Sequence, residues 1–125
     1  MRIGRGFLSV ARRLIKNANS EADFRSVINR SYYASFRVCR EIAAPRGYKI
    51  DRSGTAHRTL IEFLQGPDNG TVRQCDDLLE NLRRLWQISD YSLEGLVERS
   101  DVLNSVEDAA DIVEEKLIEL MPDAE

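Results

Sequence analysis

Residues 24–43, with the sequence FRSVINRSYYASFRVCREIA, decide the fold that we predict for this chain. Apolar and small residues recur there every three or four positions, which is the spacing of one face of an α-helix. A first stripe comprises Phe24, Val27, Ser31, Ala34, Val38 and Ile42, and a neighbouring stripe comprises Ile28, Tyr32, Ser35, Cys39 and Ala43. Because two stripes make a wide apolar face, we expect this helix to be the most buried one. Pro45 and Gly47 end it.

The centre of this helix, Arg30-Ser-Tyr-Tyr-Ala-Ser-Phe36, mixes small residues with large aromatic ones. The small residues allow another helix to approach closely. The hydroxyls of Tyr32 and Tyr33 need hydrogen-bond partners wherever they are buried. The cluster therefore predicts a tight helix crossing with both tyrosine hydroxyls at its rim. The apolar excess of this face also predicts a two-fold interface with a second copy of the chain.

The rest of the chain shows helical periodicity and no convincing strand alternation. The further helical segments are 7–18, 60–64, 75–86 and 103–120. Ser20 followed by Asp23 predicts the start of the second helix, and Thr71 followed by Gln74 predicts the start of the fourth. We therefore predict an all-α fold, an up-and-down bundle of four main helices plus one short helix, in a single domain over residues 1–125.

The composition is typical of a soluble globular domain, with 31% charged and 42% hydrophobic residues in 125. We expect no secretory signal, and no apolar run approaches the roughly 18 residues that span a membrane. Cys39 and Cys75 lack metal-site spacing and fall on apolar helical positions, so we expect buried thiols in a reducing environment. The sequence thus predicts a cytoplasmic protein without membrane contact, metal or cofactor.

Charge is distributed unevenly along the chain. Through Arg58 there are 13 Lys and Arg residues against 4 Asp and Glu residues, and after it there are 5 against 17. Such asymmetry is found in proteins that bind RNA or nucleotides. The alternative is that the two halves attract each other across the fold or across a dimer.

His57 is the only histidine, and Arg52 precedes it with four residues between them, a spacing found in some metal-independent ribonucleases. In that chemistry an arginine holds the phosphate while the histidine transfers a proton. The alternative is a structural histidine that braces the short third helix. Asp76 and Asp77 fall at helical positions that we expect to be solvated.

Arg84 and Tyr91 lie seven residues apart in the fourth helix and therefore share one of its faces. Asp90 follows Arg83 by the same interval and can pair with it. This segment either borders a functional groove or simply caps the helix and holds the following loop. The residue pattern alone leaves both interpretations open.

Four elements in this order resemble the HEPN superfamily of small helical-bundle proteins, in particular its branch of short stand-alone proteins. They correspond to an Ala-x-x-Leu first helix, an Arg-x-Tyr-Tyr-Ala-x-Phe second helix, a Lys/Thr-x-His loop and an Arg-x-x-x-x-x-Asp-Tyr end of the fourth helix. In this chain they are Ala11 to Leu14, Arg30 to Phe36, Thr55 to His57 and Arg84 to Tyr91. The resemblance covers nearly the whole chain.

The resemblance implies a homodimer with its functional groove at the dimer interface. Many members of the superfamily are RNA-cleaving toxins encoded beside a nucleotidyltransferase antitoxin. Their motif is similar to Arg, four residues, His, one residue, Tyr, which Arg84 and Tyr91 match. The resemblance also makes Tyr91 the candidate acceptor of an adenylyl group. Ser89 occupies the histidine position, and a serine hydroxyl cannot shuttle protons as imidazole does near neutral pH.

We therefore predict a homodimeric binding module for RNA, a nucleotide or a partner protein, without robust catalysis. The predicted binding residues are Arg84, Ser89, Asp90, Tyr91, Arg30 and Tyr33. The alternative is a metal-independent RNase toxin that is paired with a nucleotidyltransferase and uses Arg84, Tyr91 and His57 for catalysis. A purely structural dimer is a third interpretation.

Overall fold

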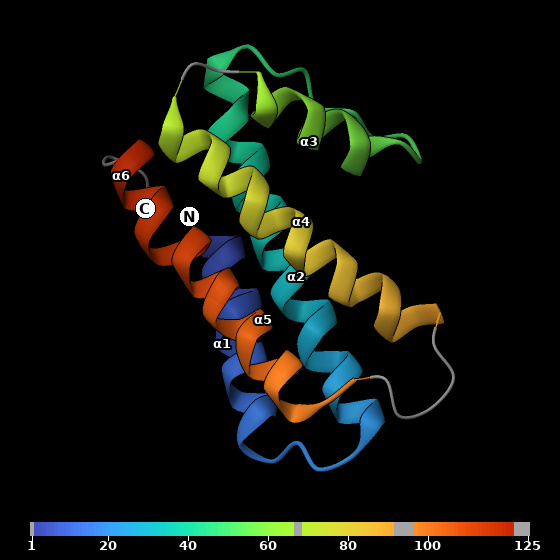
Figure 1. The fold of residues 1–125 in the computed structure, drawn as a ribbon. Coiled ribbons are helices and arrows are strands. Elements are labelled where there is room, and N and C mark those ends of the chain that lie inside the picture. Colours follow the sequence, from blue (N-terminus) through green and yellow to red (C-terminus); the bar gives the residue numbers. More distant parts are fainter. Residues whose placement is uncertain (1, 67–68, 92–96, 122–125) are drawn as a thin grey trace.

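The chain forms a bundle of α-helices in the computed structural model (Figure 1). The structure describes residues 2–66, 69–91 and 97–121, except for the side chains at positions 2–4, 21, 90 and 91, and these ranges contain no strand. The helices are α1 (Arg2–Lys16), α2 (Glu21–Ala43), α3 (Ala56–Gln65), α4 (Gly70–Tyr91), α5 (Arg99–Ala110) and α6 (Leu117–Leu120). A short 3₁₀ turn (Ala44–Arg46) follows α2, and a π-helical turn (Asp111–Lys116) joins α5 to α6.

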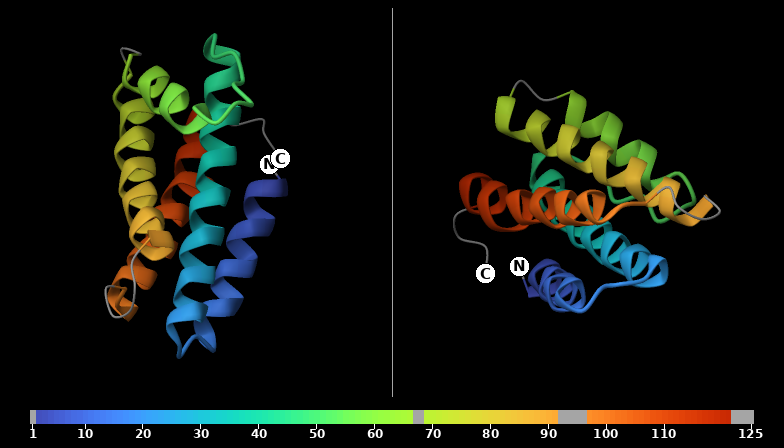
Figure 2. Two further views of the ribbon diagram at one scale, coloured as in Figure 1. Left: turned by 90° about the vertical axis from the view of Figure 1, so that its right-hand side faces the viewer. Right: turned by 60° about the horizontal axis from the view of Figure 1, so that its bottom comes forward.

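The longest helix, α2, lies at the centre of the bundle. It packs against α1, α4 and α5 (Figure 2), while the short α3 contacts α2 and α4 at one end of the bundle (Figure 1). Because α5 and α6 continue one another through the π-helical turn, the described part of the chain has four main helices and one short one. The predicted all-α bundle is therefore confirmed.

The wide apolar face of α2 is buried within the single chain. Its two stripes have no exposed side chain from Val27 onward, and both Ser31 and Ser35 are fully enclosed. The prediction that Tyr32 and Tyr33 both lie at a rim is half wrong, because Tyr32 is 0% exposed whereas Tyr33 is 37% exposed. The apolar excess from which we predicted a two-fold interface is consumed by α1, α4 and α5, so the homodimer depends on the family resemblance alone.

Side chains start both long helices, but one of them is not the residue that we predicted. The Ser20 hydroxyl oxygen accepts from the Asp23 amide at 3.2 Å, as the sequence indicated. At the start of α4 the cap is Asn69, whose side-chain oxygen accepts from the amides of Thr71 and Val72 at 3.0 and 3.3 Å. The Thr71 hydroxyl bonds a distant carboxylate, so the predicted capping role of Thr71 is wrong.

The last main helix widens at Asp111–Lys116 into a π-helical turn. Such a turn places residues five apart above one another, and Lys116 Nζ lies 3.2 Å from an Asp111 carboxylate oxygen. The regular three-and-four spacing over 103–120 did not predict this change of pitch. The turn keeps Ile112, Val113 and Leu117 buried together in the core.

Two arginines hold the ends of the bundle together. Arg46 donates to the Ile42 and Leu120 carbonyls at 2.8 and 3.1 Å, and Arg99 donates to the Ala18 carbonyl at 2.8 Å. These carbonyls lie at or just beyond helix C-termini, where four carbonyls have no partner within the helix. Arg46, which belongs to the basic half of the sequence, therefore has a structural role.

Two further predictions concern the cysteines and membrane-spanning helices. Cys39 and Cys75 are free and buried, as expected. In the described ranges, no helix is both long and apolar enough to cross a membrane.

Candidate functional site

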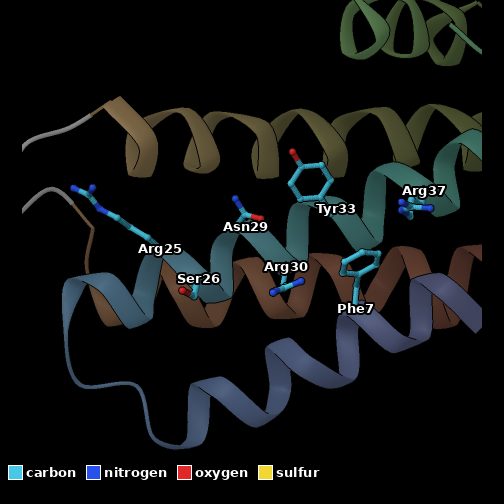
Figure 3. Close-up of a pocket in the computed structure, with 7 residues that line it drawn as sticks. All are labelled: Phe7, Arg25, Ser26, Asn29, Arg30, Tyr33 and Arg37. Atoms are coloured by element: carbon cyan, nitrogen blue, oxygen red, sulfur yellow. The ribbon is translucent and has the colours of Figure 1, made fainter. Parts of the chain in front are cut away.

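A basic cavity of about 500 Å³ opens on the exposed side of α2 (Figure 3). We call it the arginine cavity; it is lined by Phe7, Arg25, Ser26, Asn29, Arg30, Tyr33 and Arg37. Every lining residue but Phe7 comes from α2, at positions that helical periodicity places on one side of the helix. Two residues that we predicted for binding, Arg30 and Tyr33, therefore meet in one cavity.

An aromatic ring contacts two of the arginines at this cavity, Arg30 and Arg37. The Phe7 ring from α1 lies under the guanidinium carbons of Arg37 and Arg30, at 5.4 and 6.0 Å from its centroid. The Tyr33 ring lies 6.5 Å from the Phe7 ring. A cation–π contact orients a guanidinium and leaves its positive charge for an anion.

The charge of its lining distinguishes this cavity from three other surface cavities. Among the described residues that line it, none is acidic. The three other cavities each contain at least one carboxylate, from Glu114, from Asp23, or from Asp101 and Asp108. An ion pair between Arg12 and Glu114 also joins the basic and acidic halves of the chain. The arginine cavity is consistent with an anionic partner, and the pair of Arg12 and Glu114 is consistent with attraction between the two halves of the chain.

A row of rings connects the arginine cavity with His57. The Tyr33 ring lies 5.8 Å from the Tyr32 ring, which stacks on Trp86 at 5.3 Å and lies 5.3 Å from the His57 imidazole. Phe36 closes the cluster with an edge contact to His57 at 4.7 Å. His57 therefore lies on the inner side of the same segment of α2 that carries Arg30 and Tyr33.

The loop before α3 fixes the position of His57. The Asp51 carboxylate accepts from the Ser53 amide at 2.8 Å and from the Thr55 and Thr59 hydroxyls at 3.0 and 3.2 Å. Hydrogen bonds from Ser53, Thr55 and Thr59 lower the pKa of Asp51 to about 2. The network holds the first turn of α3 on the loop, and so presents His57 to α2.

The hydrogen bond between the Tyr32 hydroxyl and His57 Nδ1 decides the protonation of the imidazole. Burial raises the pKa of Tyr32 far above its ordinary value, so its hydroxyl keeps its proton. With that proton directed to Nδ1, the nitrogen accepts and the imidazole hydrogen lies on Nε2. Burial and the charge of Arg83 lower the pKa of His57, which keeps the ring neutral. In this state Nε2 donates a hydrogen bond and cannot accept a proton.

The charge beside His57 comes from Arg83, not from Arg52, with which the sequence paired it. Consecutive helix residues point about 100° apart, so Arg84 faces elsewhere. Arg84 is exposed, donates to the Asn81 side chain one turn back, and borders a cavity between α4 and α5. That cavity shares no lining residue with the arginine cavity, so the structure does not bring Arg84 to Arg30 and Tyr33.

Ser89 does not form part of a binding surface. It is 1% exposed, and its hydroxyl donates to the Trp86 carbonyl at 2.9 Å. The prediction that Ser89 contacts a ligand is therefore incompatible with its position. The side chains of Asp90 and Tyr91 lie outside the described part of the chain, although the backbone of both belongs to α4.

Sequence reasoning missed Arg37, Phe7 and Arg83. Arg37 follows Arg30 by seven residues, and that spacing on one helix was available as a signal. Phe7 begins the predicted helical segment 7–18, and nothing in the sequence shows that its ring reaches Arg37. The sequence motif pointed to Arg84 and not to Arg83, because only the tertiary structure shows which of the two faces α2.

The paired carboxylates of α4 also differ from expectation. Asp77 is exposed as predicted, but Asp76 is 4% exposed, so the expectation of a solvated side chain is wrong for Asp76.

Comparison with protein-family models, with curated proteins and with solved structures found no significant match to this chain.

Proposed function

We propose that this chain is a module that binds single-stranded RNA through the arginine cavity and does not cleave it. One observation carries the proposal: several arginines and two aromatic rings converge on a cavity that has no acidic lining residue among those described. Proteins that bind single strands combine basic grooves for the backbone with aromatic rings on which bases stack. Tyr33, 37% exposed at the edge of the cavity, offers such a ring.

The environment of His57 supports binding in preference to cleavage. A general base in RNA cleavage has to accept a proton from the attacking hydroxyl. With Nδ1 accepting from the Tyr32 hydroxyl, His57 offers only a donor at Nε2, and Ser89 at the motif position is enclosed in the core. The resemblance to the HEPN superfamily favours an RNA-linked role as well. Membership in that superfamily and the homodimer stay predictions.

The proposal is tested by fluorescence anisotropy with a labelled oligouridine. We expect Arg30→Ala and Arg37→Ala each to weaken binding about tenfold, since a charge-assisted hydrogen bond to phosphate contributes about 1.5–3 kcal/mol. Each loss should also flatten the dependence of log Kd on log salt by about 0.7. Arg73→Ala, which removes an exposed arginine of α4, is the matched control and should leave both quantities unchanged.

Two results would contradict this proposal. Equal losses for Arg73→Ala and Arg30→Ala would mean diffuse attraction without a site. Binding of AMP as tight as that of the oligonucleotide would make the ligand a mononucleotide.

The alternative, a metal-independent RNase toxin paired with a nucleotidyltransferase, is favoured by one arrangement. The only histidine lies within the field of Arg83 and is connected to the arginine cavity through Tyr32 and Tyr33. Cleavage of total RNA that is lost in both His57→Ala and Arg83→Gln would establish it. Cleavage lost only in Arg84→Ala would instead point to the cavity between α4 and α5.

A further inference from the structure

Asp76 of α4 has a buried carboxylate that lacks a hydrogen-bond partner for one of its two oxygens among the residues that the structure describes. It is 4% exposed, and its Oδ1 has no hydrogen-bond partner in the described part of the chain. The Gln65 side chain, at the end of α3, lies close enough to Asp76 to favour its charged form. A buried charge of this kind has to be paired, protonated or bound to a metal.

Two further carboxylates converge on Asp76 from the same helix. One oxygen each of Asp76, Asp77 and Glu80 lies within 4.8 Å of the others. Oxygens bound to one Ca²⁺ ion at 2.3–2.6 Å are separated by at most about 5 Å, so one ion can contact all three. Asp77 and Glu80 are exposed and open the cluster to solvent, whereas Asp76 forms its enclosed side.

The position of the cluster at the end of α3 adds to its negative potential. The last carbonyls of a helix lack intrahelical partners and carry its negative dipole end. Gln65 is the last residue of α3, and its side chain reaches Asp76. Carboxylate, amide and carbonyl oxygens are the ligand types that hard divalent cations prefer.

We propose that Asp76, Asp77 and Glu80, with Gln65, form a binding site for one hard divalent cation of the Ca²⁺ or Mg²⁺ class. The ion would bridge α4 to the end of α3 and neutralise the buried carboxylate. This site lies outside the arginine cavity and does not depend on the proposed RNA binding. Its role is structural, since it would fix the helix that carries His57.

The site is tested on the full chain after treatment with a chelator. Calorimetric titration with CaCl₂ and with MgCl₂ should show one cation per chain, and Asp76→Asn should weaken that binding at least tenfold. The isosteric amide removes the charge that opposes folding, so Asp76→Asn should fold stably without the cation. Glu107→Gln, an exposed carboxylate of α5, is the control and should bind as the parent does.

A second measurement locates the ion. Substoichiometric MnCl₂ should broaden the backbone amide signals of Gln65 and of residues 74–81 before those of α1. The proposal is overturned if millimolar cation gives neither binding heat nor a shift in melting temperature. It is equally overturned if Asp76→Asn and Glu107→Gln weaken binding alike, because the ion would then be attracted only by the general acidity of the surface.

Discussion

At the scale of single residues, His57 shows how the fold changes the chemistry of a side chain. The sequence predicted that His57 is a candidate catalytic residue. In the structure its Nδ1 is hydrogen-bonded to the Tyr32 hydroxyl, and Arg83 lies near the ring. Aromatic rings of α2 and α4 enclose the imidazole. His57 thus carries an uncharged imidazole that links α3 to α2 through its hydrogen bond with Tyr32.

This environment makes the stability of the protein depend on pH through His57. Its folded pKa is lower than its unfolded value near 6.5, so the unfolded chain binds the proton more tightly. The stabilisation is fully present above that unfolded value and is lost as the pH falls through the lower folded pKa. In urea unfolding, the free-energy difference between the parent and His57→Gln should shrink from about pH 7.5 to about pH 5. Taking the difference between the two variants cancels the titration of the carboxylates, which both variants share.

Arg83→Gln provides the companion measurement. Removing the neighbouring positive charge should raise the pKa of His57, as followed by NMR titration of its ring protons. Arg84→Gln, one position further along the same helix, should leave the pKa of His57 unaltered, because Arg84 faces α5. A shift of equal size in both variants would contradict the orientation of α4 described above.

At the scale of elements, the start of α4 shows that two nearby residues can both be suited to cap one helix. Asn69 and Thr71 both have side chains suited to an N-cap, and the chain uses Asn69. Thr71 is then one residue inside the helix, and its hydroxyl bonds Glu119 of α6 at 2.9 Å. The Thr71 hydroxyl, which the sequence predicted to cap α4, is therefore used in a tertiary contact with α6.

The role of Asn69 gives a direct stability prediction. Asn69→Ala should destabilise the fold by about 1 kcal/mol, because two amides of the first turn of α4 lose their acceptor. For a chain of this size the melting temperature should fall by roughly 4 °C in calorimetry. Asn69→Asp keeps the acceptor and adds a favourable charge at a helix N-terminus, so it should restore the loss. A greater loss for Thr71→Val than for Asn69→Ala would speak against this assignment.

At the scale of the whole molecule, the basic and acidic halves of the sequence occupy different helices. The arginine cavity on α2 contains no acidic residue among the described residues that line it. On α1, in contrast, Arg5, Arg12 and Arg13 line a cavity together with Glu114 of the π-helical turn. A net charge of −3 therefore hides a basic side that can attract a polyanion.

This arrangement predicts where a nucleic acid will bind. In NMR titration with oligouridine, amide shift changes should concentrate in residues 5–16 and 25–40 and be small in residues 99–120. The changes should diminish steeply with added salt, because phosphate binding releases counterions. Changes concentrated in α4 and α5 instead would contradict the assignment to the arginine cavity and favour the groove predicted around Arg84.

The sequence by itself determined the helices, their order and the burial of α2. Those features follow from periodicity and from local breakers such as Pro45 and Gly47, which act on neighbouring residues in the chain. It also identified Arg30 and Tyr33, which the structure brings into one cavity. Only the tertiary structure decided that Arg83 and not Arg84 faces His57, that Ser89 and Asp76 are enclosed, and that Phe7 reaches Arg37. The physical reason is rotation about the helix axis: one position shifts a side chain by about 100°, and packing between helices sets which direction is inward.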